Sequence, residues 1–144
     1  MLGVSSYDHD YIEACRARVH SQVAAYNGLL EAARGNSKAA AAPLESAITS
    51  FDSVFYNNMV LSLDSYFTHR LRTKEGKDGN PLNEVRVLSA SLLNGGALVA
   101  DKTIKLDPAK SLLGYAVGDE IKVGEEGFTR LAKAYFAAVE RAYS

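Results

Sequence analysis

The segment from Leu44 to about Thr73 constrains the fold most, because it predicts a single long helix with almost no polar face. Between Val54 and Phe67 this segment is apolar nearly all round. A helix that is apolar on every side is buried by its neighbours. The residues that repeat at the helical spacing of three or four are Ile48, Phe51, Phe55, Met59 and Tyr66. The sequence therefore predicts a central helix that other elements surround.

Three amphipathic segments are predicted to supply those surrounding elements. The first runs from about residue 7 to residue 34 and carries apolar residues on one face. Another begins at Asn80 and Pro81, which suit the cap and the first helical position, and ends near Asn94. The last covers residues 125–143, with acidic residues in its first turn. The alanine-rich stretch at 37–42 fits either a loop or a helix.

The part before the last helix has a different character. Short β-like runs at 97–99, 103–106 and 120–123 are separated by Asp-Pro and Gly-Asp turn signals. A short helical turn is expected at 111–115. The predicted fold is therefore mainly α: one four-helix-bundle-like domain over residues 1–144, with a small β-hairpin inserted before the last helix.

Composition and charge narrow the class of protein. The chain is 47% hydrophobic and 23% charged, has a net charge of -1 and a pI near 6.3, which is ordinary for a globular domain and makes nucleic acid an unexpected partner. Its one cysteine, Cys15, excludes an intramolecular disulfide and cysteine-rich zinc sites. No signal peptide or stretch of about 18 apolar residues is recognised. A cytoplasmic protein without a membrane partner is expected.

Polar residues interrupt the central helix. Asn57, Asn58 and Asp64 are predicted to be buried polar residues, and they fall on two narrow stripes at about 100° per residue. Amides and carboxylates in an apolar setting cost free energy unless they are hydrogen-bonded. Either they bond to neighbouring elements in a structural network, or they line a cavity that holds a ligand.

The end of this helix carries a concentration of charge. Five potential cations lie within nine residues, followed by Asp78, Gly79 and the predicted helix start at Asn80. Arginines, glycines and the amides of a helix start together favour binding of an anion such as phosphate, sulfate or a carboxylate. The candidate ligand-binding residues are His69, Arg70, Arg72, Lys77, Asn80, Asn83, Glu84 and Arg86. The alternative is an internal web of salt bridges that also uses Glu75 and Asp78.

Two further functions stay open beside this anion-binding module. One is a hydrolase or nuclease-like enzyme with His69 as acid or base, facing Asp64 or Glu84, and Arg72 as anion stabiliser. The other is a structural homodimer built on helix faces. No nucleophile, base and orienting group can be assembled from sequence spacing, so catalytic residues are unassigned. With three scattered histidines, no metal and no cofactor are expected.

Four motifs carry a resemblance to a known family. They are NNMV at 57–60, HRLR at 69–72, EGKDGNPLNEVR at 75–86 and DKTIKL at 101–106. In these motifs the chain resembles a small uncharacterised bacterial protein family, over roughly its C-terminal two-thirds. The resemblance implies a bacterial protein but no activity. It leaves open whether the 69–86 motif serves folding or binding.

Overall fold

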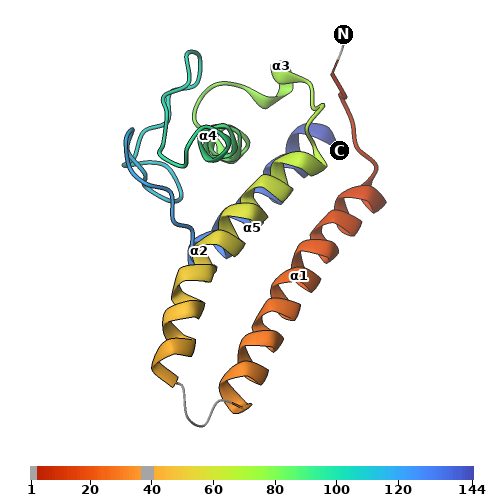
Figure 1. The fold of residues 1–144 in the computed structure, drawn as a ribbon. Coiled ribbons are helices and arrows are strands. Elements are labelled where there is room, and N and C mark those ends of the chain that lie inside the picture. The colour runs from red at the N-terminus through yellow and green to blue at the C-terminus, as the bar shows by residue number, and fades with distance from the viewer. Residues whose placement is uncertain (1–2, 37–40) are drawn as a thin grey trace.

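A computed structural model describes residues 3–36 and 41–144, and 65% of these residues are helical (Figure 1). Residues 37–40, within the stretch that fitted either loop or helix, lie outside the described residues. Within the described ranges, none of the helices combines the length and the apolarity that a bilayer span requires. The described residues form five helices, α1 (His9–Asn36), α2 (Ala41–Tyr66), α3 (Arg72–Glu75), α4 (Pro81–Leu93) and α5 (Glu125–Tyr143).

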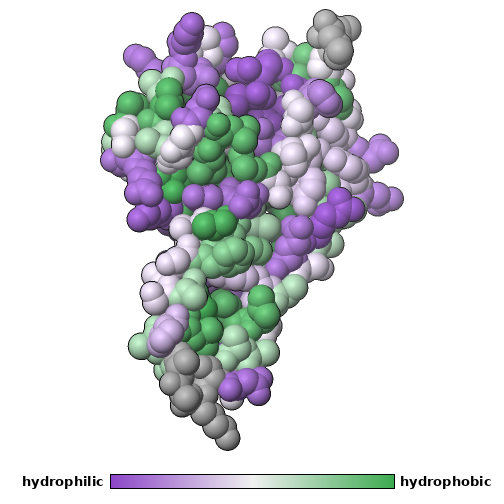
Figure 2. All heavy atoms as spheres, viewed as in Figure 1, coloured by the Kyte–Doolittle hydropathy of each residue, from purple (hydrophilic) through white to green (hydrophobic). Residues whose placement is uncertain are grey.

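Helix α2 lies at the centre and packs against α1, α4 and α5. Four of its five buried residues, Tyr56, Met59, Val60 and Leu63, come from the stretch that is apolar all round, and the fifth is Ile48. Helices α1 and α2 run antiparallel as a long hairpin, and the half of this hairpin nearest residues 37–40 extends beyond the rest of the molecule (Figure 1). We call this projecting half, residues 24–36 and 41–55, the arm. Apolar atoms are visible over the arm in Figure 2.

The central helix ends earlier than predicted, at Tyr66 instead of about Thr73. The amide of Phe67 donates to the Asp64 carbonyl at 3.2 Å, which tightens the last turn. The guanidinium of Arg70 then donates to the Phe67 carbonyl at 3.1 Å. The backbone amide of Arg70 donates to this carbonyl as well, at 3.1 Å, and the Leu71 amide, which a continuing helix would direct there, donates to the Val4 carbonyl instead. The chain then turns away into α3.

The predicted β-hairpin is wrong, because no β-strand occurs in the described part of the chain. Ala97 and Glu120 form only an isolated antiparallel bridge. Side chains occupy the backbone groups that a ladder would need: Asn57 binds the Ile121 carbonyl and the Val123 amide at 2.9 and 3.1 Å. Leu98, Ile104, Ile121 and Val123 are buried in the core, and the few backbone hydrogen bonds between 96–98 and 118–121 do not extend into a ladder.

The N-terminal segment is bound to the end of the molecule where α2 stops. Val4 forms a parallel bridge with Arg70, and the Tyr7 amide donates to the Tyr143 carbonyl at 2.7 Å. Gly3 has no room for a side chain, since an added Cβ would lie 2.7 Å from the Leu71 Cα. The start of the chain, α5 and the turn after α2 therefore meet in one place (Figure 1).

Candidate functional site

The segment from the end of α2 through the first turns of α4, residues 67–86, forms a corner built on a buried arginine. The Arg70 side chain is fully buried, and its guanidinium donates to Glu75 at 2.9 Å and to Asp64 at 3.1 Å. The Tyr135 hydroxyl lies 3.3 Å from one guanidinium nitrogen, and the Leu82 carbonyl accepts from the other at 3.3 Å. A buried charge needs such partners, because desolvation without them would cost several kcal/mol. Arg70 is therefore part of the scaffold and not free for a ligand.

Glu75 is the common acceptor of the corner. Its carboxylate, also fully buried, accepts from Arg86 at 2.6 Å and from Asn83 at 2.9 Å, besides Arg70. Burial alone would raise the pKa of the Glu75 carboxyl. The Arg86 hydrogen bond and the charges of Arg70 and Arg86 outweigh burial and hold the pKa below its usual value.

The start of α4 is closed by its own cap, as the sequence predicted. The Asn80 side chain accepts from the amides of Leu82 at 2.9 Å and Asn83 at 3.2 Å, and Pro81 occupies the first turn. Because these amides are occupied, they offer no anion site. Gly79 has φ +86°, and an added Cβ would lie 2.8 Å from the Lys105 carbonyl, so this turn must be glycine.

Glu84 faces away from the corner and anchors the loop before α5. Its two carboxylate oxygens accept from the amides of Leu112 and Leu113 at 2.8 and 2.9 Å. This buried carboxylate fixes a loop that has no β-ladder of its own. Among the predicted ligand-binding residues, Arg70, Asn80, Asn83 and Glu84 thus have structural partners, and Lys77 is exposed.

A cleft of about 380 Å³ opens on the outer side of the corner. Its side chains include His69, Arg72 and Arg86, and none of the described residues that line it is a carboxylate. The Arg72 side chain is 51% exposed and lies 3.9 Å from Glu75, at the limit of an ion pair. The imidazole of His69 makes no hydrogen bond to Asp64 or Glu84 within the described ranges, so the pairing that would favour an enzyme is absent there.

The polar stripe of α2 is a hydrogen-bond network rather than a cavity lining. Asn58 lies at the exposed surface, not in the core as predicted, and donates to the Val54 carbonyl of its own helix. Asn57 is half-buried and holds the loop at Ile121, as described above. Asp64 is half-buried and accepts from Arg70. Each of these three polar groups has found a protein partner.

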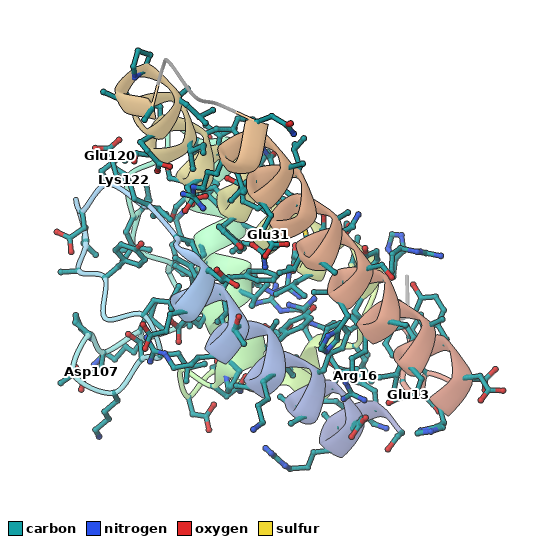
Figure 3. All side chains as sticks on the ribbon, turned by 90° about the horizontal axis from the view of Figure 1, so that it is seen from below. Glu13, Arg16, Glu31, Asp107, Glu120 and Lys122 are labelled. Carbon is teal, nitrogen blue, oxygen red and sulfur yellow. The ribbon has the colours of Figure 1, made fainter. Side chains whose placement is uncertain are left out.

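A second cavity, which sequence reasoning missed, lies between α1, α2 and the start of α5. It measures about 650 Å³, and we call it the acidic pocket. Glu31 comes from α1, Asp52 from α2 and Glu125 from α5, and Figure 3 shows Glu31 on the inner side of α1. Asp52 stands between Ile48 and Tyr56 at intervals of four, which places a carboxylate on a buried helix face. That spacing was the one signal in the sequence.

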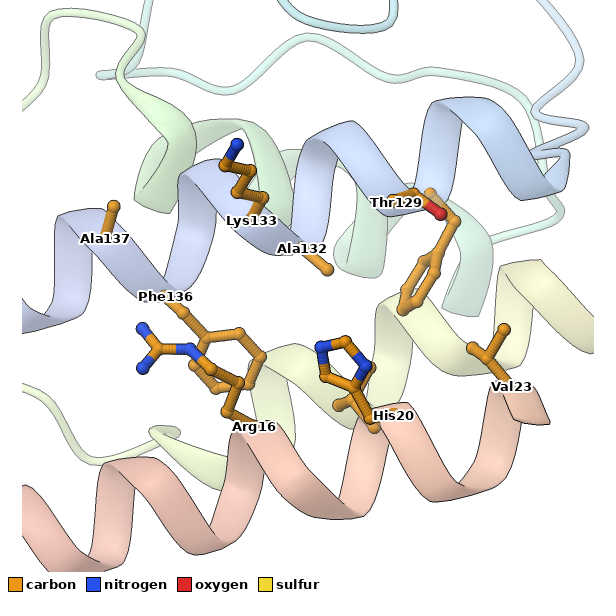
Figure 4. Close-up of a pocket in the computed structure, with 10 residues that line it drawn as sticks. Arg16, His20, Val23, Thr129, Ala132, Lys133, Phe136 and Ala137 are labelled. Carbon is orange, nitrogen blue, oxygen red and sulfur yellow. The ribbon is translucent and has the colours of Figure 1, made fainter. Parts of the chain in front are cut away.

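The third cavity is an apolar groove of about 510 Å³ between α1 and α5 (Figure 4). Its rim holds Arg16, which pairs with Glu140 at 2.7 Å and also with Glu13 (Figure 3). The His20 ring lies toward α5, whereas Lys133 points away from α1 (Figure 4). The walls are formed by Val19, Val23, Phe128, Ala132 and Phe136. No charged group in the groove is both buried and unpaired, so the groove identifies no ligand.

No three metal-ligating side chains converge closely enough to hold an ion in the part of the chain that the structure describes. No protein-family model, curated protein or solved structure matches the chain. The resemblance to a bacterial family therefore stays a prediction, and the geometry of the corner and the cavities is the basis for a functional proposal.

Proposed function

We propose that the protein binds a small anion, a phosphate or a carboxylate, in the cleft at the outer side of the corner. The observation that carries the proposal is a mismatch of charge. Three arginines, Arg70, Arg72 and Arg86, share two carboxylates, Glu75 and Asp64. The unmatched positive charge lies on the exposed Arg72, beside a cleft without a carboxylate in its described lining.

The corner would hold its guanidinium groups in place before a ligand arrives. Glu75 fixes Arg86 through both the Nε and one terminal nitrogen, and the other terminal nitrogen of Arg86 donates to no group in the described ranges. Arginine binds planar or tetrahedral oxyanions through paired N–H groups. Arg86 and Arg72 would contact the anion, while Arg70, Asn83 and Asn80 support them.

Asp101 is a carboxylate outside this cleft whose charge interacts with that of Arg72. Its Oδ1 accepts from the amides of Thr103 and Ile104 at 2.8 and 2.9 Å. These hydrogen bonds, and to a smaller degree the charge of Arg72, lower the pKa of the Asp101 carboxyl. Because Asp101 does not line the cleft, it weakens the local positive field without occupying the site.

The test is calorimetric titration of inorganic phosphate and of succinate at low salt. Arg72→Gln is expected to weaken binding about tenfold, the usual effect of losing one charge-assisted hydrogen bond. Arg34→Gln is the matched control, because Arg34 is similarly exposed at 48% but lies on the arm. Asp101→Asn is expected to strengthen binding. Equal losses in the Arg72 and Arg34 variants, or no saturable binding, would contradict the proposal.

The exposed apolar residues of the arm favour a homodimer as a second proposal. Leu29, Phe51 and Val54 are 64%, 50% and 49% exposed, and a second copy pairing with the arm would cover them. Light scattering at two concentrations should show a dimer that Phe51→Glu dissociates and that Leu93→Glu, on α4, leaves intact. We also propose that the protein is located in the cytoplasm, which cell fractionation would test.

A further inference from the structure

The acidic pocket holds carboxylates that no cation neutralises. Glu31, Asp52 and Glu125 make no ion pair with any described residue. Arg34, the one arginine among the described residues of the lining, already donates to both carboxylate oxygens of Glu45 at 2.7 and 3.1 Å. The pocket therefore carries an excess of negative charge that its own positive charge does not offset.

The partners of these carboxylates are neutral donors. The Tyr26 hydroxyl donates to Asp52, and the Asn27 amide donates to Glu125 at 3.1 Å. Neutral donors orient a carboxylate without cancelling its charge. Both groups are therefore held in position and remain able to attract a cation.

Tyr56 supplies a second and independent observation. This side chain lines the pocket and is only 1% exposed, yet its buried hydroxyl makes no hydrogen bond with any described residue. A buried hydroxyl without a partner costs free energy, and native structures rarely leave one. Burial and the nearby charges of Glu125 and Asp52 raise its pKa to about 12, so it stays a neutral hydroxyl whose oxygen can accept from an N–H group.

The walls between these polar groups are apolar and aromatic. The Tyr26 and Tyr56 rings meet edge to face with centroids 5.8 Å apart, and Leu30 and Ile48 complete the lining. A bare metal ion would gain nothing from such walls, whereas an alkyl chain would be desolvated against them. The cavity of about 650 Å³ is in the range of small-molecule sites.

We propose that the acidic pocket binds an aliphatic amine, a diamine or polyamine, whose ammonium groups reach Asp52, Glu125 and the Tyr56 hydroxyl while its methylenes lie against Tyr26, Leu30 and Ile48. Glu31, which is exposed at the mouth of the pocket, would receive a second ammonium group. This site is separate from the anion cleft and shares no lining residue with it.

The experiment is calorimetric titration of the full chain with 1,4-diaminobutane and spermidine at physiological salt, with 1,4-butanediol and MgCl₂ as neutral and inorganic probes. Saturable binding of the amines alone is expected. Asp52→Asn and Glu125→Gln, which keep the hydrogen-bonding shape, should each weaken it about tenfold, and Tyr56→Phe about fivefold. Glu120→Gln, an exposed carboxylate outside the pocket, should leave it unchanged.

Three results would overturn the proposal. The first is that neither the wild type nor the variants bind the amines saturably, although cooperative melting in circular dichroism shows that all of them are folded. The second is equal binding of Mg²⁺, which would mean that negative charge alone attracts cations. The third is full amine affinity in Tyr56→Phe, which would mean that the hydroxyl is satisfied by water and contributes no contact.

Discussion

The corner around Glu75 and the acidic pocket beside Tyr56 solve the same problem in opposite ways. Both bring charged side chains from several helices to a partly buried place. At Glu75, two guanidinium groups and one amide saturate a single carboxylate. At the acidic pocket, the carboxylates form no ion pair and a buried hydroxyl forms no hydrogen bond with the residues that the structure describes. The difference teaches that polar groups with protein partners hold this fold together, whereas polar groups without them indicate where a ligand would be stabilised.

The largest effect is expected from removing the charge at the centre of the corner. Glu75→Gln should lower the free energy of unfolding by about 3–5 kcal/mol, because it leaves a fully buried Arg70 without its principal counter-charge. Urea denaturation measures this loss. Arg72→Gln, at the exposed edge of the same cluster, should cost at most about 1 kcal/mol. Similar losses in both variants would mean that the cluster is not organised around Arg70.

The pH dependence of the free energy of unfolding should also reflect the Glu75 carboxyl. The Glu75 carboxyl has a lower pKa in the folded chain than in the unfolded chain, so its stabilisation is present above the unfolded pKa and is lost as the pH falls through the folded pKa. The difference in unfolding free energy between wild type and Glu75→Gln should therefore shrink below about pH 4, the ordinary range of a glutamate. A difference that stayed constant down to acidic pH would contradict the assignment.

A smaller loss is expected where a carboxylate holds the loop before α5. Glu84→Gln should cost about 1–3 kcal/mol, because glutamine offers only one acceptor to the amides of Leu112 and Leu113. Glu120→Gln, on the exposed part of the same loop, provides the control and should stay within about 0.5 kcal/mol of wild type. Chemical denaturation, with amide exchange at residues 112–113, distinguishes a local from a global effect.

The smallest change in stability is expected at the acidic pocket, and the sign of this change distinguishes the pocket from the saturated corner. Tyr143→Phe removes a hydroxyl that donates to the Leu71 carbonyl at 2.7 Å and should cost about 1 kcal/mol. Tyr56→Phe removes a buried hydroxyl that has no hydrogen-bond partner among the described residues and should leave thermal stability unchanged or raised. A loss in Tyr56→Phe as large as that in Tyr143→Phe would show that the Tyr56 hydroxyl is already satisfied.

Local signals predicted the helices well, but not the places where side chains replace backbone partners. The cap at Asn80 with Pro81, and the last helix at 125–143, are confirmed, because capping and amphipathic spacing depend on neighbouring residues. The β-hairpin and the extension of the central helix to Thr73 are wrong, since the Asn57 side chain and the Leu71 amide pair with distant backbone groups, at Ile121 and Val4, that no spacing reveals.

The candidate site was predictable only in part for the same reason. The concentration of charge at 69–86 is visible in the sequence, but its division into scaffold and exposed groups depends on which guanidinium reaches Glu75. The acidic pocket combines Glu31, Asp52 and Glu125 from three helices. Only tertiary packing brings together residues so far apart in the chain, and Asp52 alone carried a local signal.

The hydrogen bond from Tyr143 to the Leu71 carbonyl also limits when the corner can form during synthesis. These residues are separated by 72 positions, and α5 is synthesised after α2 and α4. Until then, Arg70 lacks the Tyr135 hydroxyl, and Phe67 lacks the Phe136 ring that packs against it. The corner can therefore become native only after translation of α5, and the nascent chain exposes this apolar end to chaperones in the meantime.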